Sequence, residues 1–478
     1  GSPAKFEACV PRQTHTTDTT HEAALALATS TLGEGRANTR GIEALGAPIT
    51  LEQAYREEIL DNKMSKYPSF LPRLKRLDIK SALPLLRFTL LPIPTYLTRV
   101  LYPTLIAPHA RKFDQDIYDT YKAVAGDAAL ERDDEDLVRP ARLGGQGLRS
   151  VERTSPIAHF CSLVNAMYAL KDKVTEIRDA LEHFRFYQAP DPPPAPPDRP
   201  PPFPAVLAVG LPHKLAVAWA LCHNTIFRDS PSEFFPESLP LLFRNIAHGF
   251  IQQDQYQKTL TAEMEEARAD AAEADRSQEG IARNISNRIR GSSALLSATP
   301  TPAFNKLSFA AFSTHLKLRA GTYEMPHKFC KCGKQRLTAE HCLSCSHMKG
   351  VIIRHDVLVE SITQMFLDAG KVARSEVRVI AGTQMRMDVV VYSGASVLWI
   401  DVSVVNPLAP SYIAHPKTAL KRRESAKKSK WEAHATARGI TFMPFVVNVY
   451  GGLGEDAINV LQRLSSAALQ NYPYRLAV

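Results

Sequence analysis

The stretch DVVVYSGASVLWID, from Asp388 to Asp401, decides the fold of the C-terminal part of the chain. Two short apolar runs flank a Ser-Gly-Ala-Ser segment, which is typical of two strands joined by a turn. With the turn centred between Gly394 and Ala395, Asp388 faces Asp401 on the neighbouring strand, where like charges repel. A bound divalent cation, a shared proton or a nearby lysine would compensate. A register slip of one residue would instead place the two carboxylates on opposite faces.

The segments around this hairpin predict a small α/β domain. A helix over 351–370 precedes strands at 375–380, 386–392 and 396–405, and a helix over 418–439, a strand at 441–450 and a final helix over 455–469 follow. The helix after the hairpin supplies Lys427, Lys428 and Lys430, whose ammonium groups can position water or stabilise charge on a phosphate. Two acids, a lysine and this αβββαβ order describe the core of a PD-(D/E)xK nuclease. The alternative is that both aspartates only cap strand ends.

Six possible metal ligands occur between residues 330 and 347. Four tetrahedral sulfur or nitrogen donors are what structural zinc requires. The sequence predicts a Cys₃His zinc site formed by Cys330, Cys332, His341 and Cys345. Cys342 or His347 can substitute for one of these ligands, and Gly333 permits a tight turn after the first pair. No H-E-x-x-H motif occurs, so a structural rather than a catalytic zinc ion is expected.

Composition and charge indicate a folded, moderately basic protein. The 478 residues are 45% hydrophobic and 22% charged, with a formal charge of +9, and at roughly 150 residues per domain they predict about three domains. The segment 420–430 holds six basic residues and one acidic residue. Such clusters suit a polyanion, so we expect nucleic-acid contacts from Lys421, Arg422, Arg423 and Lys430. No apolar run long enough to span a bilayer and no signal peptide are found, so an intracellular, reducing compartment is expected.

The rest of the chain reads as mostly helical. Apolar residues at three-to-four spacing predict helices over most of residues 1–185 and again over 205–325. Between them, residues 188–204 are rich in proline and form an extended spacer. The stretch 256–291 is long, charged and rich in Ala, Glu and Arg, and it predicts a solvated helix or coiled coil.

The C-terminal third resembles the C-terminal part of non-LTR retrotransposon proteins of the restriction-like-endonuclease class. The Cys/His cluster, RHD (354–356), RMDVVV, IDVSVV, KKSKW and FMPFVVNVYGGLG carry this resemblance. In that family a Cys/His knuckle precedes a PD-(D/E)xK endonuclease that nicks target DNA. The resemblance implies these catalytic residues: Arg354, His355, Asp388, Asp401 and either Lys427 or Lys428. Met387, Trp431 and Ser403 stand where the family or the common motif has proline, tyrosine and lysine.

The N-terminal half also resembles the family. SPAKFEACVP looks like the segment after the polymerase catalytic loop, GIEALGAPI (41–49) like the primer-grip hairpin, and residues 142–164 like the glycine motif and helix of the thumb. The resemblance implies a palm remnant over 1–60, a thumb-like domain over 61–187, the linker 188–204, a helical connector over 205–325, a zinc knuckle over 326–350 and an endonuclease domain over 351–478. No Tyr-x-Asp-Asp loop occurs, so this chain alone is not expected to reverse transcribe, and we expect a fragment of a longer protein or a degenerate copy.

The expected fold is therefore multi-domain, with helical N-terminal two thirds, a small zinc knuckle and a C-terminal α/β restriction-endonuclease-like part. The expected function is metal-dependent nicking of target DNA to prime reverse transcription, with structural Zn²⁺ and catalytic Mg²⁺ or Mn²⁺. Target DNA and element RNA are the expected partners, the nucleus is the expected compartment, and no membrane is involved. The alternative is a domesticated or degenerate nucleic-acid-binding or assembly protein without nuclease activity. An unrelated zinc protein would be indicated if residues 388–401 were helical.

Overall fold

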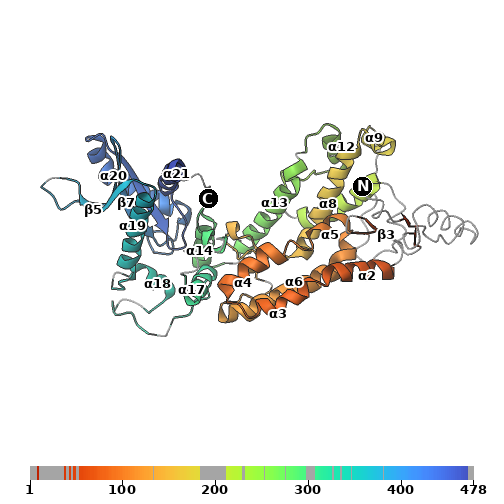
Figure 1. Ribbon diagram of the computed structural model, residues 1–478, viewed down its shortest axis with the longest axis horizontal. Helices are drawn as coiled ribbons and strands as arrows, with labels where there is room; N and C mark the ends of the chain where they lie inside the picture. Colours follow the sequence, from red (N-terminus) through yellow and green to blue (C-terminus); the bar gives the residue numbers. More distant parts are fainter. Residues whose placement is uncertain are drawn as a thin grey trace, which may run out of the picture. The chain divides into compact units, whose positions relative to one another are not determined.

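The computed structural model divides the chain into two compact units (Figure 1). The first unit takes in residues up to 132 and 148–268, and the second takes in 133–147 and everything from 269 onward. The described residues are 53–132, 134–182, 211–228, 232–251, 253–274, 276–297, 307–325, 328–333, 336–345, 347–380 and 382–471, with four short strands before residue 50. The proline-rich linker 188–204 and most of SPAKFEACVP lie outside them. The predicted connector 205–325 is thus divided between the two units.

The first unit is helical, as predicted, apart from short strands near its start. β1 (Ala8–Cys9) pairs with β2 (Ala37–Asn38), and β3 (Ile42–Ala44) with β4 (Ala47–Ile49), the latter being the hairpin expected from GIEALGAPI. The helices are α2 (Gln53–Met64), η2 (Tyr67–Phe70), α3 (Leu71–Leu74), α4 (Ile79–Leu85), η3 (Leu86–Leu90), α5 (Thr95–Val100), α6 (Pro103–Ala125), η4 (Gly126–Ala128), α8 (Val151–Leu170), α9 (Thr175–Glu182), α11 (Leu211–Cys222), η7 (His223–Phe227), α12 (Leu239–Ala247) and α13 (Gln253–Ala274). Phe160, Val164 and Phe243 lie in a fully buried core shared by several of these helices.

The predicted single solvated helix over 256–291 is wrong. α13 ends at Ala274 and α14 (Gln278–Arg288) begins anew after Ser277, whose side chain accepts a hydrogen bond from the Gly280 N–H and caps the new helix. α14 is also not solvated, because Asn284 and Asn287 are buried. Four further helices of the second unit precede its sheet: α7 (Glu135–Val138), η5 (Ala141–Leu143), α15 (Ala294–Ser297) and α17 (Phe309–Ala320).

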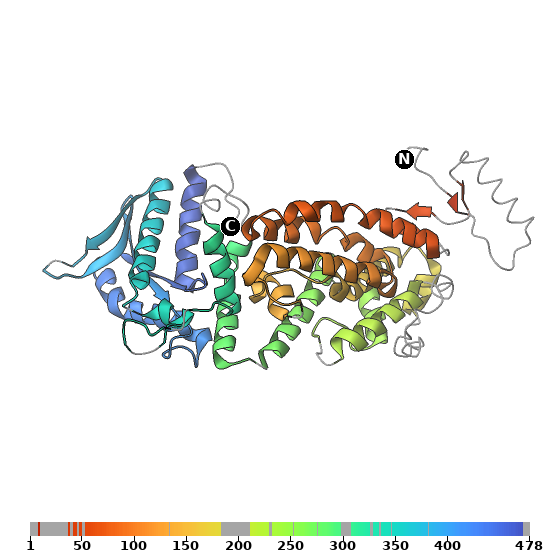
Figure 2. The same ribbon diagram turned by 90° about the horizontal axis from the view of Figure 1, so that it is seen from below.

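A four-stranded mixed sheet forms the C-terminal part of the second unit (Figure 2). The elements run α19 (Gly350–Asp368), β5 (Val372–Arg378), β6 (Arg386–Ser393), β7 (Ser396–Val405), η8 (Pro416–Thr418), α20 (Ala419–Thr436), β8 (Thr441–Asn448) and α21 (Glu455–Asn471). The strands lie in the order β5-β6-β7-β8, antiparallel except for β7 and β8, which are parallel and joined through α20. The predicted αβββαβα order is confirmed, although β5 begins and ends earlier than expected.

The hairpin of β6 and β7 has the predicted register. Val390 pairs with Trp399 and Tyr392 with Val397, and Gly394 adopts a φ of 61° in the turn, a conformation that glycine takes without strain. Residues 388–401 are therefore not helical. One face of the sheet packs on α19 and α21, and the other packs on Trp431 of α20. Covered faces on both sides explain why these strands read as nearly continuous apolar runs.

Candidate metal centres

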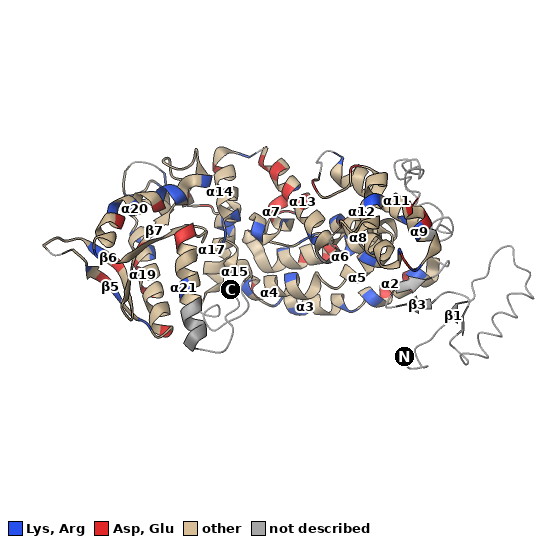
Figure 3. Cartoon of the chain, turned by 90° about the horizontal axis from the view of Figure 1, so that it is seen from above, with Lys and Arg blue, Asp and Glu red and all other residues tan. Residues whose placement is uncertain are grey.

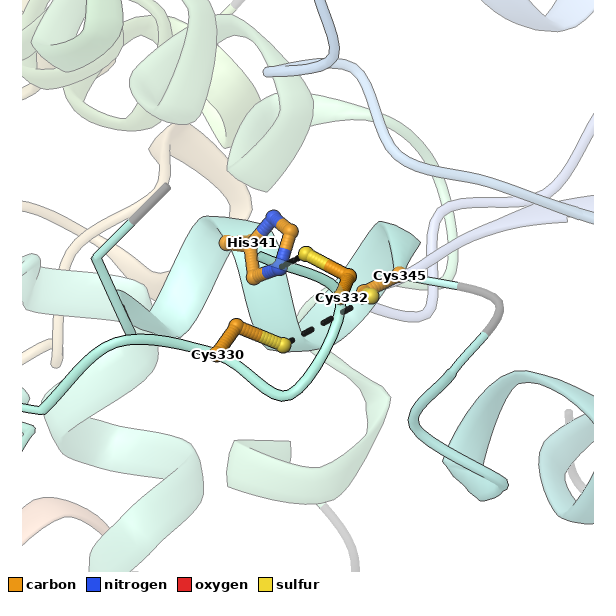
Figure 4. Close-up of side chains that lie close together, drawn as sticks. All are labelled: Cys330, Cys332, His341 and Cys345. Carbon is orange, nitrogen blue, oxygen red and sulfur yellow. Dashed lines mark hydrogen bonds between the residues drawn. The ribbon is translucent and has the colours of Figure 1, made fainter. Parts of the chain in front are cut away.

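A Cys₃His group lies before α19 (Figure 4). One ligand atom from each of its four members lies within 4.8 Å of all the others, and the members are Cys330, Cys332, His341 and Cys345. These are the four residues that the spacing predicts, and three thiols with one imidazole form a donor set that zinc binds. Cys342 and His347 are described residues outside this group. The group can therefore hold a structural zinc ion without either of the alternative ligands.

Local sequence explains how the four ligands converge. Gly333 follows the first pair with a φ of 72°, which reverses the chain. The short helix α18 (Ala339–Ser344) begins at Thr338, whose hydroxyl accepts a hydrogen bond from the His341 N–H at 3.1 Å. The helix ends at Cys345, whose N–H donates to the His341 carbonyl at 2.8 Å. One turn of helix thus places the last two ligands on the same side.

The second candidate centre lies at one end of the β6–β7 ladder. The last pair of that ladder is Val389 with Ile400, so Asp388 and Asp401 follow it in register. Oδ2 of Asp388 accepts a hydrogen bond from the Val402 N–H at 2.6 Å. Both carboxylates are largely buried, with 14% and 6% of the Asp388 and Asp401 side chains exposed. The two aspartates are therefore not surface caps at strand ends.

Each aspartate takes a partner from a different helix. Nε2 of His355, on α19, lies 3.2 Å from Oδ2 of Asp388, and Nζ of Lys427, on α20, lies 2.5 Å from Oδ2 of Asp401. The two helices cover opposite faces of the sheet. The acid pair lies where the β6–β7 ladder ends, while β7 continues to pair with β8 as far as Val405. Apart from this ion pair, no described residue donates a hydrogen bond to Oδ2 of Asp401. Lys427 therefore offsets part of the negative charge of the two facing carboxylates, which is one of the three ways of compensation expected from the sequence.

The electrostatics of this centre favour cations. Burial, together with the charge of Asp401, raises the pKa of Asp388 above its usual range. Burial lowers the pKa of His355, but a hydrogen bond with Asp356 and the charge of Asp388 outweigh it, so the net pKa is raised. A raised carboxyl pKa means that the folded protein disfavours this negative charge unless a cation is near. A divalent ion bound by oxygen ligands would supply that charge.

The two neighbouring lysines differ in their contacts. Lys427 pairs with Asp401, whereas Nζ of Lys428 lies 2.7 Å from Oδ2 of Asp456, at the start of α21. The hydrogen bond between Lys428 and Asp456 raises the pKa of Lys428 most, and the negative charge of Asp456 raises it further. Of the two lysines that the sequence left open, only Lys427 therefore contacts the acid pair.

The other predicted site residues are dispersed. Arg354 donates a hydrogen bond to the carbonyl of Leu343 in α18 rather than to either aspartate. Arg423 donates to Oγ of Ser403 at 2.7 Å and so faces the sheet. The exposed cations of α20 are Lys421, Arg422 and Lys430, the last of which lies over the Trp431 ring. These three are exposed to a polyanion, although Arg422 also donates a hydrogen bond to the Ser411 carbonyl at 3.1 Å.

Two buried polar residues near the centres carried no sequence prediction. Glu424 accepts a hydrogen bond from the Asp456 N–H at 3.1 Å and so caps α21, the helix whose Asp456 holds Lys428. Asn406 lies just after β7 and contacts α18. The only sequence signal for Asn406 is the Asn-Pro step that ends the strand, which is typical of a turn. Glu424 lies within a basic helix, where a lone acid reads as a solvated charge.

In comparisons with known proteins, no family model and no curated protein matches this chain.

Among the described residues no helix has the length and apolarity that crossing a membrane requires. The described cysteines other than those of the Cys₃His group are also free thiols, Cys161 and Cys222 being buried.

Proposed function

We propose that the second unit is a metal-dependent endonuclease that cleaves a phosphodiester bond in DNA. The observation that carries the proposal is the Lys427–Asp401 ion pair beside Asp388, at the end of a two-strand ladder. Buried acids from adjacent strands with a lysine in contact fit a site that holds Mg²⁺ or Mn²⁺ next to a phosphate. The resemblance to the restriction-like-endonuclease class of retrotransposon proteins supports the same reaction, including its role in priming reverse transcription.

The chain's own residues have distinct tasks in this proposal. Asp388 and Asp401 would hold the divalent ion, which makes the phosphorus more electrophilic and lowers the pKa of bound water. Lys427 orients the attacking water or stabilises the negative charge that develops on the phosphate oxygens. The water oxygen bonds to phosphorus and loses a proton to solvent, while the bond to the leaving sugar oxygen breaks and that oxygen takes up a proton from solvent. His355 holds Asp388 in place through its 3.2 Å contact.

A basic surface in the first unit supports a nucleic-acid substrate. Residues 62–113 contain ten Lys and Arg but one acidic residue, so this segment alone carries +9, the formal charge of the whole chain. Figure 3 shows blue segments along α3 and α4, in contrast to the red-rich α13. Large apolar side chains in the same segment are exposed, including Phe70, Phe88 and Tyr96. Cations with exposed aromatic rings are typical of nucleic-acid-binding surfaces.

The test is nicking of supercoiled plasmid by the full chain with Mg²⁺ or Mn²⁺. We expect metal-dependent conversion to open circles, and at least about a 10³-fold slower rate for Asp401→Asn, because the variant loses a ligand for the ion while keeping its shape. The matched control is Asp456→Asn, which changes another carboxylate that is mostly shielded from solvent and contacts the neighbouring lysine. Equal nicking by wild type and Asp401→Asn would refute the assignment. DNA binding without any cleavage would favour a nucleic-acid-binding protein.

A further inference from the structure

α18, the short helix that carries His341, is anchored by a buried side chain that comes from the end of β7. Nδ2 of Asn406 donates to the carbonyl of Glu340 at 3.1 Å and to Oγ of Ser344 at 2.6 Å. These residues directly precede His341 and Cys345, the two zinc ligands at this helix. Asn406 is itself fixed, because its Oδ1 accepts a hydrogen bond from the Leu408 N–H. A single amide thus holds both ends of α18.

A second anchor comes from α19. Nη2 of Arg354 donates to the carbonyl of Leu343, also in α18, at 2.5 Å. Arg354 directly precedes His355, which contacts Asp388. Asn406 lies five residues after Asp401 on the same stretch of chain. The two anchors therefore lead from the Cys₃His group to both halves of the acid pair.

We propose that Asn406 and Arg354 are positioning residues that couple metal binding at the Cys₃His group to divalent-cation binding at Asp388 and Asp401. This rests on the proposed function. α18 buries only Ala339, so its own apolar contacts do little to fix it. Polar contacts hold it, including an ion pair of Glu340 with Arg283, and bonds from His341 and Cys345 to a metal ion would fix it further. When α18 is fixed, its hydrogen bonds with Arg354 and Asn406 hold α19 and the end of β7 in place. Because linkage is reciprocal, an ion at either centre favours binding at the other.

The neighbouring strand offers a matched control for Asn406. Asn448 ends β8, where it pairs in register with Val405, the residue before Asn406. Its Oδ1 accepts hydrogen bonds from Tyr450 and Gly452, and its Nδ2 donates to the Ser286 carbonyl at 3.2 Å. Asn448 is thus also buried and hydrogen-bonded through both ends of its amide, but its Nδ2 bond runs to α14 instead of α18. Replacing it tests the general cost of losing a buried amide.

The experiment is a Mn²⁺ titration of the full chain, followed by electron paramagnetic resonance, with zinc content measured throughout. Thiolate sites disfavour Mn²⁺, so the titration reports the carboxylate site. We expect about tenfold weaker Mn²⁺ binding after zinc is stripped, within the usual range of coupling between sites. Zinc-loaded Asn406→Ala should show a similar loss, while zinc-loaded Asn448→Ala should bind Mn²⁺ like wild type.

The possible outcomes test the coupling between the two centres and the proposed nuclease function separately. Equal Mn²⁺ affinity for wild type and zinc-loaded Asn406→Ala would overturn the coupling and leave the acid pair as a metal site. An equal loss in Asn448→Ala would also overturn it, because the effect would then be a general loss of packing. Mn²⁺ binding by no form of the chain would overturn the proposed function instead. If the stripped protein unfolds, the zinc-loaded variants still decide between these outcomes.

Discussion

The two candidate metal centres of the second unit are built in opposite ways. The Cys₃His group gathers three sulfur donors and one nitrogen donor from sixteen consecutive residues, and its ligand atoms converge within 4.8 Å through one turn and one short helix. The acid pair gathers two hard donors from neighbouring strands, and its partners come from helices on opposite faces of the sheet. The first centre is local and depends on spacing. The second centre depends on contacts between elements that are far apart in the sequence.

A large expected effect, of the order of 100-fold or more, separates the ligands of the local centre from a neighbouring cysteine. Cys345→Ser should lower zinc affinity by at least about 100-fold, because a thiolate ligand is lost and zinc binding supplies the free energy that folds such loops. Cys342→Ser, one helical turn away, should retain one zinc ion per chain, because Cys342 lies outside the Cys₃His group. Zinc content and thermal unfolding measure both. Loss of zinc in Cys342→Ser would show a different ligand set.

The next prediction concerns the different effects of Lys427 and Lys428 on the nicking rate. Lys427→Ala should slow nicking by about 10²–10³-fold, in the range seen when a charge-stabilising group is removed from an active site. Lys428→Ala should change the rate by less than about threefold, because that side chain contacts Asp456 rather than the acid pair. Single-turnover nicking rates at saturating Mg²⁺ measure the difference. The reverse order would move the catalytic lysine to position 428.

How far the sequence predicts these centres follows from their construction. Spacing predicted the four members of the Cys₃His group but left Cys342 and His347 as alternatives to one of them. The chain between the members is short, and Gly333 marks its turn. The Ser-Gly-Ala-Ser turn also fixed the strand register that aligns Asp388 with Asp401. The choice between Lys427 and Lys428 could not be made, because it depends on Asp456, at the start of a later helix, and on Glu424, which caps that helix. Burial of α14 was likewise invisible, because its asparagines pair with distant backbone and side chains.

The smallest effect concerns the basic surface of the first unit. The variant Arg73→Gln, Lys75→Gln, Arg76→Gln removes three exposed cations between η2 and α4. DNA affinity should become less sensitive to salt, with the slope of log K against log salt concentration smaller in magnitude by up to about three. The rate of nicking at saturating DNA and low salt should not change, because the acid pair is untouched. An unaltered salt slope would show that this surface does not contact the phosphate backbone.

The central claim is that Asp388 and Asp401 together bind a divalent cation, and Mn²⁺ binding to zinc-loaded protein tests it without reference to activity. Wild type should bind one Mn²⁺ at this centre, and the double variant Asp388→Asn, Asp401→Asn should lose it while keeping its zinc and its fold. Asn preserves the size of each side chain but removes its charge, so the loss would be due to the carboxylates. Retention of the same Mn²⁺ affinity in the double variant would contradict the claim.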